Sequence, residues 1–72
     1  MRIERGNVIQ WVSRAGILEG TVLDIVLDMN AANQVCPWMI VKDIQDEDGE
    51  FHSNVMLNGN DGYLKMMKVE VL

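Results

Sequence analysis

The chain of 72 residues carries eleven acidic and six basic side chains, giving a formal net charge of -5, and 49% of its residues are hydrophobic. This length allows one hydrophobic core, which excludes a catalytic domain joined to a regulatory one, and the apolar content excludes a disordered tail. No apolar run reaches the roughly 18 residues that span a bilayer, no apolar signal segment follows the first six residues, and the single Cys36 gives no internal disulfide framework. We therefore expect one cytoplasmic domain over residues 1–72.

Two glycine-bounded segments predict the first two strands. Residues 7–12 lie between Gly6 and a polar turn and are expected to form the first strand. From residue 23 onward alternate positions are apolar, which is typical of a second strand with one buried face. The apolar stripe consists of Leu23, Ile25, Leu27 and Met29. A helix over residues 17–29 is the rival interpretation, and its β-branched residues and two glycines count against it.

The middle of the chain predicts a loop and then a hairpin. Residues 30–37 are interpreted as a long loop, because Pro37 fixes the backbone and cannot donate a ladder hydrogen bond. A strand over residues 38–44 follows and enters a tight turn in which Gly49 supplies the left-handed position. Residues 51–57 alternate in polarity and form the return strand.

The last stretch completes an all-β fold. Residues 58–62 give a strong turn signal, and residues 63–72 form a fifth strand with one short helical turn as an optional interruption. Five short strands in a chain of this size would risk aggregation if both edges of the sheet stayed open. The expected fold is therefore a small, partly closed β-barrel.

The N-terminal third resembles a known class of small barrels. Gly6 and Asn7 open the first predicted strand, and Gly20-Thr21-Val22 starts the second. These features are similar to those of the Src-homology-3-like barrels of the Tudor and KOW type, in which a glycine with a small polar residue precedes strand one and a glycine-x-valine step starts strand two. The resemblance implies a five-stranded Src-homology-3-like barrel with a binding role, since members bind nucleic acid, ribosomal partners, peptides or modified side chains. Gly20 is expected where a strand bends so sharply that a side chain would collide with its neighbour.

Few residues in the chain suit catalysis or cofactor binding. His52 and Cys36 are the only candidates for a base and a nucleophile, and no spacing marks a third member. The turns ending in Gly49 and Gly62 lack the acid that a calcium loop carries five residues before its glycine, and one histidine with one cysteine does not make a zinc site. No glycine-rich phosphate loop is present. We therefore expect no enzymatic activity, no metal and no cofactor.

The uneven charge of the chain is the main clue to its function. Between residues 19 and 61 there are nine acids and the single base Lys42. Acidic strands and loops complement a basic surface and steer its approach. The sequence therefore predicts a non-catalytic module that binds a protein with a basic surface and does not bind a membrane. The residues assigned to the acidic surface are Asp24, Asp28, Asp43, Asp46, Glu47, Asp48 and Glu50.

Nucleic-acid binding is the alternative prediction. If the first and last strands lie side by side, the basic ends of the chain form one flank with aromatic rings among the charges, which suits single-stranded nucleic acid. The residues of this flank are Arg2, Arg5, Trp11, Arg14, Tyr63, Lys65 and Lys68. The excess of acids opposes this alternative, because nucleic-acid binders usually have the opposite balance. A minor alternative is an acidic inhibitor of the phage type, which imitates nucleic acid and blocks an enzyme that binds it.

Self-association is a third class of function. Val22 and Val26 face away from the predicted apolar stripe of the second strand. If the same chain does not cover them, a second copy would cover them in a homodimer.

Overall fold

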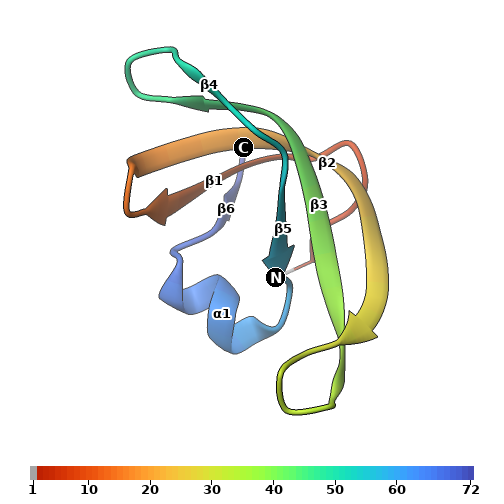
Figure 1. Ribbon diagram of the computed structural model, residues 1–72. Coiled ribbons are helices and arrows are strands. Elements are labelled where there is room, and N and C mark those ends of the chain that lie inside the picture. Colours follow the sequence, from red (N-terminus) through yellow and green to blue (C-terminus); the bar gives the residue numbers. More distant parts are fainter. Residues whose placement is uncertain (1) are drawn as a thin grey trace.

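The structure is a computed structural model that describes residues 2–72, and it contains six strands and one short helix (Figure 1). The elements in chain order are β1 (Val8–Ser13), β2 (Gly16–Met29), β3 (Val35–Asp46), β4 (Phe51–His52), β5 (Val55–Asn58), α1 (Asp61–Met66) and β6 (Glu70–Val71). All strand pairings are antiparallel, in the order β4-β3-β2-β1-β6, and β5 also pairs with β3. The prediction of a small, mostly β fold is confirmed. The helix α1 begins in the predicted turn over residues 58–62 and replaces the first part of the last predicted strand.

The sheet has one more strand than expected and is open. β1 lies between β2 and β6, so the predicted adjacency of the first and last strands is confirmed. The expected return strand is divided into β4 and β5 at residues 53 and 54. No pairing within residues 2–72 joins β6 to β4 or β5, so backbone hydrogen bonds do not close the sheet into a barrel.

A long hairpin of β2 and β3 replaces the loop predicted over residues 30–37. β3 begins at Val35, and Pro37 lies in the ladder opposite Leu27. Pro37 is tolerated there because its carbonyl accepts a hydrogen bond from the Gly59 N–H at 2.8 Å on the side away from β2. In a strand the N–H and C=O of one residue point to the same side, so the N–H that proline lacks would also have pointed away from β2. The β2–β3 ladder therefore loses no donor. The rival helix over residues 17–29 is wrong.

A β-bulge bends the hairpin near its base. The register shifts between the pairs Glu19 with Gln45 and Thr21 with Lys42, so β3 carries an extra residue there. Asp43 has a φ of 51°, in the left-handed region. A Cβ atom at Gly20 would lie 2.7 Å from Val41 Cγ1 and 2.9 Å from Ile44 Cγ1, much closer than real contacts allow. The expectation that only glycine fits at residue 20 is confirmed.

A second bulge changes which side chains of β2 are buried. Val22 pairs with Val41 and Asp24 pairs with Ile40, so Leu23 is the extra residue. Val22 and Ile25 consequently both turn toward the core, while Leu23 is exposed. The predicted buried stripe is therefore wrong for Leu23, because the bulge interrupts the period of two. It is also wrong for Leu27 and Met29, which share the face of Ile25 but lie on the part of the hairpin that projects beyond the core. The condition set for a second copy at Val22 is not met, since its own chain leaves it only 1% exposed.

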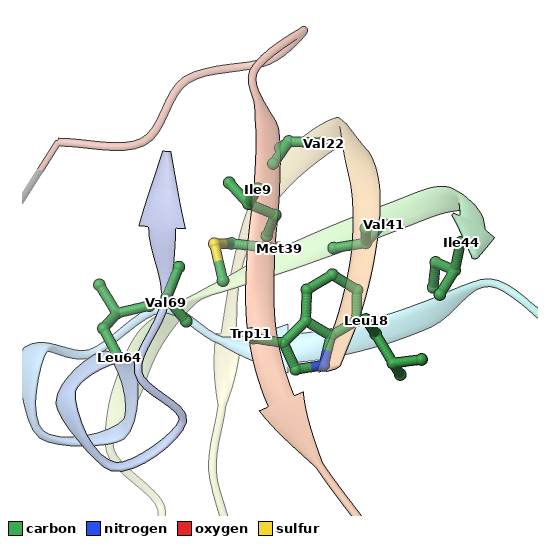
Figure 2. Close-up of a cluster of buried hydrophobic side chains, with 9 residues drawn as sticks. All are labelled: Ile9, Trp11, Leu18, Val22, Met39, Val41, Ile44, Leu64 and Val69. Atoms are coloured by element: carbon green, nitrogen blue, oxygen red, sulfur yellow. The ribbon is translucent and has the colours of Figure 1, made fainter. Parts of the chain in front are cut away.

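The hydrophobic core lies inside the curved sheet and is covered on one side by α1 (Figure 2). Leu64 of α1 and Val69 lie together at one end of this cluster, and Leu18 and Ile44 lie at the other. Trp11 fills the space between the strands and is only 3% exposed. The whole cluster consists of Ile9, Trp11, Leu18, Val22, Met39, Val41, Ile44, Leu64 and Val69.

Candidate functional site

The acidic residues assigned to one surface lie in two separate places. Asp24 and Asp28 are in the distal half of β2, whereas Asp46, Glu47, Asp48 and Glu50 are in or next to the β3–β4 turn. β3 runs from a position opposite Asp28 to Asp46 itself, so the two groups lie at opposite ends of the hairpin. Asp43 is in the basal bulge, and its carboxylate lies 4.0 Å from the Lys42 ammonium. The seven residues assigned to the acidic surface therefore do not form one continuous patch.

Asp46 is used inside the molecule to hold the β3–β4 turn. Its Oδ1 accepts hydrogen bonds from the N–H groups of Asp48 and Glu50, at 2.9 and 3.0 Å. Its Oδ2 lies 2.9 Å from His52 Nε2, which donates because a carboxylate only accepts. The hydrogen bond from His52 lowers the pKa of Asp46, burial opposes that effect, and the two backbone hydrogen bonds add to the lowering. Asp46 has little capacity left for a partner.

An acidic hollow of about 250 Å³ lies beside that turn. Gln10, Glu19 and Gln45 line it from three neighbouring strands, because the register places them in one row across the sheet. Glu47 closes it from the turn, with its Oε1 3.4 Å from the Ile17 N–H. Glu19 was not among the site residues predicted from the sequence, and its place in a cross-strand row becomes visible only when the register is known.

The distal half of β2 has a free edge. β1 pairs with β2 only as far as Thr21. Gly6 and Asn7, which precede β1, form two further backbone hydrogen bonds with Val22. Beyond Val22 no described strand other than β3 pairs with β2. We call the segment from Asp24 to Met29 the β2 edge. This free edge arises because β2 has 14 residues and β1 only six.

The alternation along the β2 edge shows which backbone groups point outward. Leu27 lies opposite Pro37, which has no N–H and whose carbonyl points toward Gly59, so this pair exchanges no hydrogen bonds. The N–H and C=O groups of Leu27 therefore point to the open side of β2, as do those of Ile25 and Met29, which share its parity. Native sheets usually cover or blunt such an edge.

Two aspartates occupy part of this open edge. Asp24 Oδ1 accepts the N–H of Ile25 at 2.8 Å, and Asp28 Oδ1 accepts the N–H of Met29 at 2.7 Å. Each carboxylate therefore satisfies an outward donor of its own strand. Arg5 lies with its Nε 4.0 Å from Asp24 Oδ1; the Arg5 side chain is 73% exposed and that of Asp24 47%. A pair of this kind contributes little and is readily exchanged.

Exposed apolar side chains lie next to the β2 edge. Leu27 is 76% exposed, Met29 60% and Val35 65%. The pairing of Met29 with Val35, and the two-residue step from Leu27 to Met29, place all three on one face of the hairpin. The end of this hairpin projects from the rest of the molecule (Figure 1). Phe51 and Met66 are also exposed but lie on other elements. The hairpin is therefore the place where exposed apolar side chains gather next to carboxylates.

The same face leads into an apolar hollow of about 240 Å³. Ile25 and Pro37 lie on its hairpin side, Met39 at its base, and Leu64 of α1 on its far side. Arg2 and Ile3 of the N-terminal segment and Gly59 also line it. A hollow of this size accepts one aliphatic side chain from outside the chain.

The basic and aromatic residues do not form one flank. Trp11 is in the core, so its ring is not available to stack on a base, and its predicted place among surface charges is wrong. Arg5 precedes β1 and Arg14 follows it, which puts them at opposite ends of that strand. Arg2 pairs with Glu4 at 3.0 Å. The remaining members, Tyr63, Lys65 and Lys68, lie on or just after α1.

The candidate base and nucleophile are far apart along β3. Cys36 is buried in the distal hairpin, whereas His52 is bonded to Asp46 at the other end of the strand. In the part of the chain from residue 2 to residue 72, no three His, Cys, Asp or Glu side chains are grouped so as to hold a metal ion. None of the helices described there is long and apolar enough to cross a membrane.

Comparison of the chain with protein-family models, curated proteins and solved structures finds no match.

Proposed function

We propose that this chain is a non-catalytic binding module that recognises a protein with a basic surface, and that it does so through the β2 edge. The observation that carries the proposal is the meeting of Asp24 and Asp28 with the exposed Leu27, Met29 and Val35 on one projecting hairpin. Contiguous apolar surface rimmed by polar groups is typical of a protein interface. Asp24 and Asp28 lie on the other face of the same edge strand, where their carboxylates favour a basic partner and speed its approach.

The fold supports a binding role as well. We propose that it is an open form of the Src-homology-3-like barrel, with a strongly bent sheet, a short helix before the last strand and Gly20 at the sharpest bend. Small β modules of this kind use loops and hairpins on a rigid core to bind partners. A cytoplasmic location belongs to the proposal, because a single cysteine provides no disulfide framework.

Of the seven acids assigned to the acidic surface, only Asp24 and Asp28 belong to the proposed site. Asp46 is committed to the β3–β4 turn and to His52, and the acids around it lie at the other end of the hairpin from the exposed apolar side chains. Asp48 and Glu50 use only their backbone groups in that turn. They therefore serve as matched controls for Asp24 and Asp28.

Nucleic-acid binding through the basic flank has less support. The flank loses Trp11 to the core, and Arg2 and Arg5 already face Glu4 and Asp24. Phosphate attraction without stacking gives weak binding that falls steeply with salt. The alternative of an acidic imitator of nucleic acid is weakened by the separation of the acids into two groups.

The test is a capture experiment from host lysate, with and without nuclease treatment, using three forms of the full chain. Asp24→Lys with Asp28→Lys should lose the proteins that the wild type retains. Asp48→Lys with Glu50→Lys changes the net charge equally and should retain them. Circular dichroism checks that both variants are folded. If the control loses the same proteins, or if the captured material disappears with nuclease treatment, the proposed site is wrong.

A further inference from the structure

Resting on the proposed function, we infer that the β2 edge binds an extended segment of its partner as an added antiparallel strand, in which lysine or arginine alternates with aliphatic residues. Strand addition to an open edge is a recurring mode of peptide recognition, in which main-chain hydrogen bonds give affinity and alternate side chains give specificity. The β2 edge offers both the backbone groups and the alternating chemistry.

The backbone of the β2 edge is ready for this pairing. Leu27 and Pro37 face each other but exchange no hydrogen bonds, so the N–H and C=O of Leu27 point outward. No backbone group in the described part of the chain forms a hydrogen bond with them. The N–H groups of Ile25 and Met29 are held by the carboxylates of Asp24 and Asp28. An incoming strand supplies carbonyls to the same two donors. The carboxylates are thereby released on the rim of the new strand.

The side chains of the β2 edge specify the alternation of the partner. Asp24 and Asp28 lie on one face of β2, and Leu27 and Met29 lie on the other, because successive side chains point to opposite faces. Basic residues of an added strand therefore lie beside the released carboxylates. Its aliphatic residues lie beside Leu27 and next to the hollow lined by Ile25 and Pro37.

A second copy of this chain fits the β2 edge less well. Antiparallel self-pairing about Leu27 would place Asp28 diagonally across from Asp24 and Asp28 of the second copy, on one face of the joined sheet. Like charges at such cross-strand positions are destabilising. Charge complementarity therefore selects a basic strand over self-association.

The test uses the full chain and a synthetic octapeptide in which lysine and valine alternate. In an antiparallel pair, valine lies opposite Leu27, so the valine N–H groups point toward β2 and the lysine N–H groups point away. N-methylation of a central valine should therefore weaken binding about tenfold, whereas N-methylation of a central lysine should leave it unchanged within about threefold. Titration calorimetry measures both affinities.

Two further readouts separate strand addition from simple charge attraction. The Leu27 amide should exchange its hydrogen more slowly when the peptide is bound, whereas the Val26 amide, which already faces β3, should not change. Asp24→Asn with Asp28→Asn removes the charge but keeps acceptors for the two N–H groups, and it should weaken binding about fivefold. Asp48→Asn with Glu50→Gln makes the same change in net charge and should bind like the wild type.

The outcomes distinguish this inference from the proposed function. Equal loss from both N-methylated peptides, or loss from neither, would overturn strand addition, and loss confined to the lysine position would overturn its antiparallel direction. If the Asp24 and Asp28 variants still lose their lysate partners in that case, the protein-binding role stands and only the mode of binding is wrong. Failure of the octapeptide to bind at millimolar concentration would also overturn the inference.

Discussion

The two turns at the ends of β3 have the same hydrogen bonds but different surroundings. In one, Asn30 Oδ1 accepts the N–H groups of the residues two and four positions later, and Asn33 takes a left-handed φ of 58°. In the other, Asp46 Oδ1 accepts the equivalent N–H groups, and Gly49 takes a φ of 83°. The backbone hydrogen bond across each turn is also equivalent. The Asn30 N–H donates to the Gln34 carbonyl at 2.9 Å, and the Asp46 N–H donates to the Glu50 carbonyl at 3.0 Å.

The difference lies in what surrounds each turn. The Asp46 turn is joined to His52 and lies close to the buried Ile44, whereas the Asn30 turn ends a hairpin whose apolar side chains stay exposed. Turn geometry is therefore set locally by side-chain acceptors and left-handed positions. Burial is set by what the rest of the chain places over a strand. Four pairs of variants test this distinction between turn geometry and burial.

The largest effect is expected from truncating apolar residues at the two ends of the hairpin. Ile44→Ala removes a side chain with no exposed surface and should lower the free energy of unfolding by about 3 kcal/mol. Leu27→Ala, at 76% exposure, should change it by less than about 0.5 kcal/mol. Urea denaturation measures both. A comparable loss at Leu27 would mean that a second copy covers the hairpin, and Tm would then depend on protein concentration.

A smaller loss is expected from Gly20→Ala at the basal bulge. The added methyl group would meet side chains of Val41 and Ile44 and would lie 3.0 Å from the Lys42 carbonyl oxygen, which cannot move aside. Overpacking of this kind costs about 1 to 3 kcal/mol. Gly62→Ala is the control, because no atom lies within 4 Å of its added Cβ and alanine favours the helix. Equal stability of the two variants in thermal denaturation would contradict the bulge geometry.

The left-handed positions of the two turns should respond differently to alanine. Gly49→Ala should cost about 1 kcal/mol, because alanine is strained at a positive φ although the space around it is empty. Asn33→Ala should cost less, about 0.5 kcal/mol, because asparagine already carries part of that strain. Chemical denaturation of the two single variants compares these costs. A larger loss at Asn33 than at Gly49 would show that the turns are not equivalent.

The smallest effect is a dependence of stability on pH that belongs to one turn only. The folded chain holds the pKa of Asp46 below its ordinary 3.8, so its carboxylate stabilises the fold above that value, and the contribution is lost as the pH falls through the lowered folded pKa. Asp46→Asn should therefore flatten the fall of Tm on the acid side, measured between roughly pH 3 and pH 7. Asn30→Asp introduces a carboxylate that accepts two backbone N–H groups but has no histidine partner, so it should add less acid sensitivity than Asp46 contributes. An unchanged acid profile in Asp46→Asn would contradict the role of His52.

Much of the fold could be predicted from turn and glycine signals. Gly49 indicated the β3–β4 turn, Gly20 indicated the bend, and β1 was expected next to the last strand. The Asn30 turn was missed because asparagine is a weaker left-handed signal than glycine and because Pro37 was taken to end any strand. The structure shows that a proline is tolerated where its missing N–H points away from the paired strand.

The exposed and buried sides of β2 could not be predicted from alternation alone. Leu23 and Val22 exchanged roles because a single bulged residue reverses the side on which later residues lie. The candidate site was predicted in part, since Asp24 and Asp28 were named among the acids. Two features could not be predicted, because they depend on hydrogen bonds that composition does not specify. Asp46 is hydrogen-bonded within its own turn, and the β2 edge is unpaired.

Cys36 allows the opening of the distal hairpin to be measured chemically. Its thiol is free, 1% exposed, and opposite Asp28 in the part of the hairpin that projects from the core. A buried thiol reacts with an alkylating reagent only when the structure around it opens, so the rate of alkylation reports how often that happens. In the ladder only one pair, Met29 with Val35, lies between Cys36 and the Asn30 turn. Alkylation faster than global unfolding therefore measures the fraying of the hairpin itself.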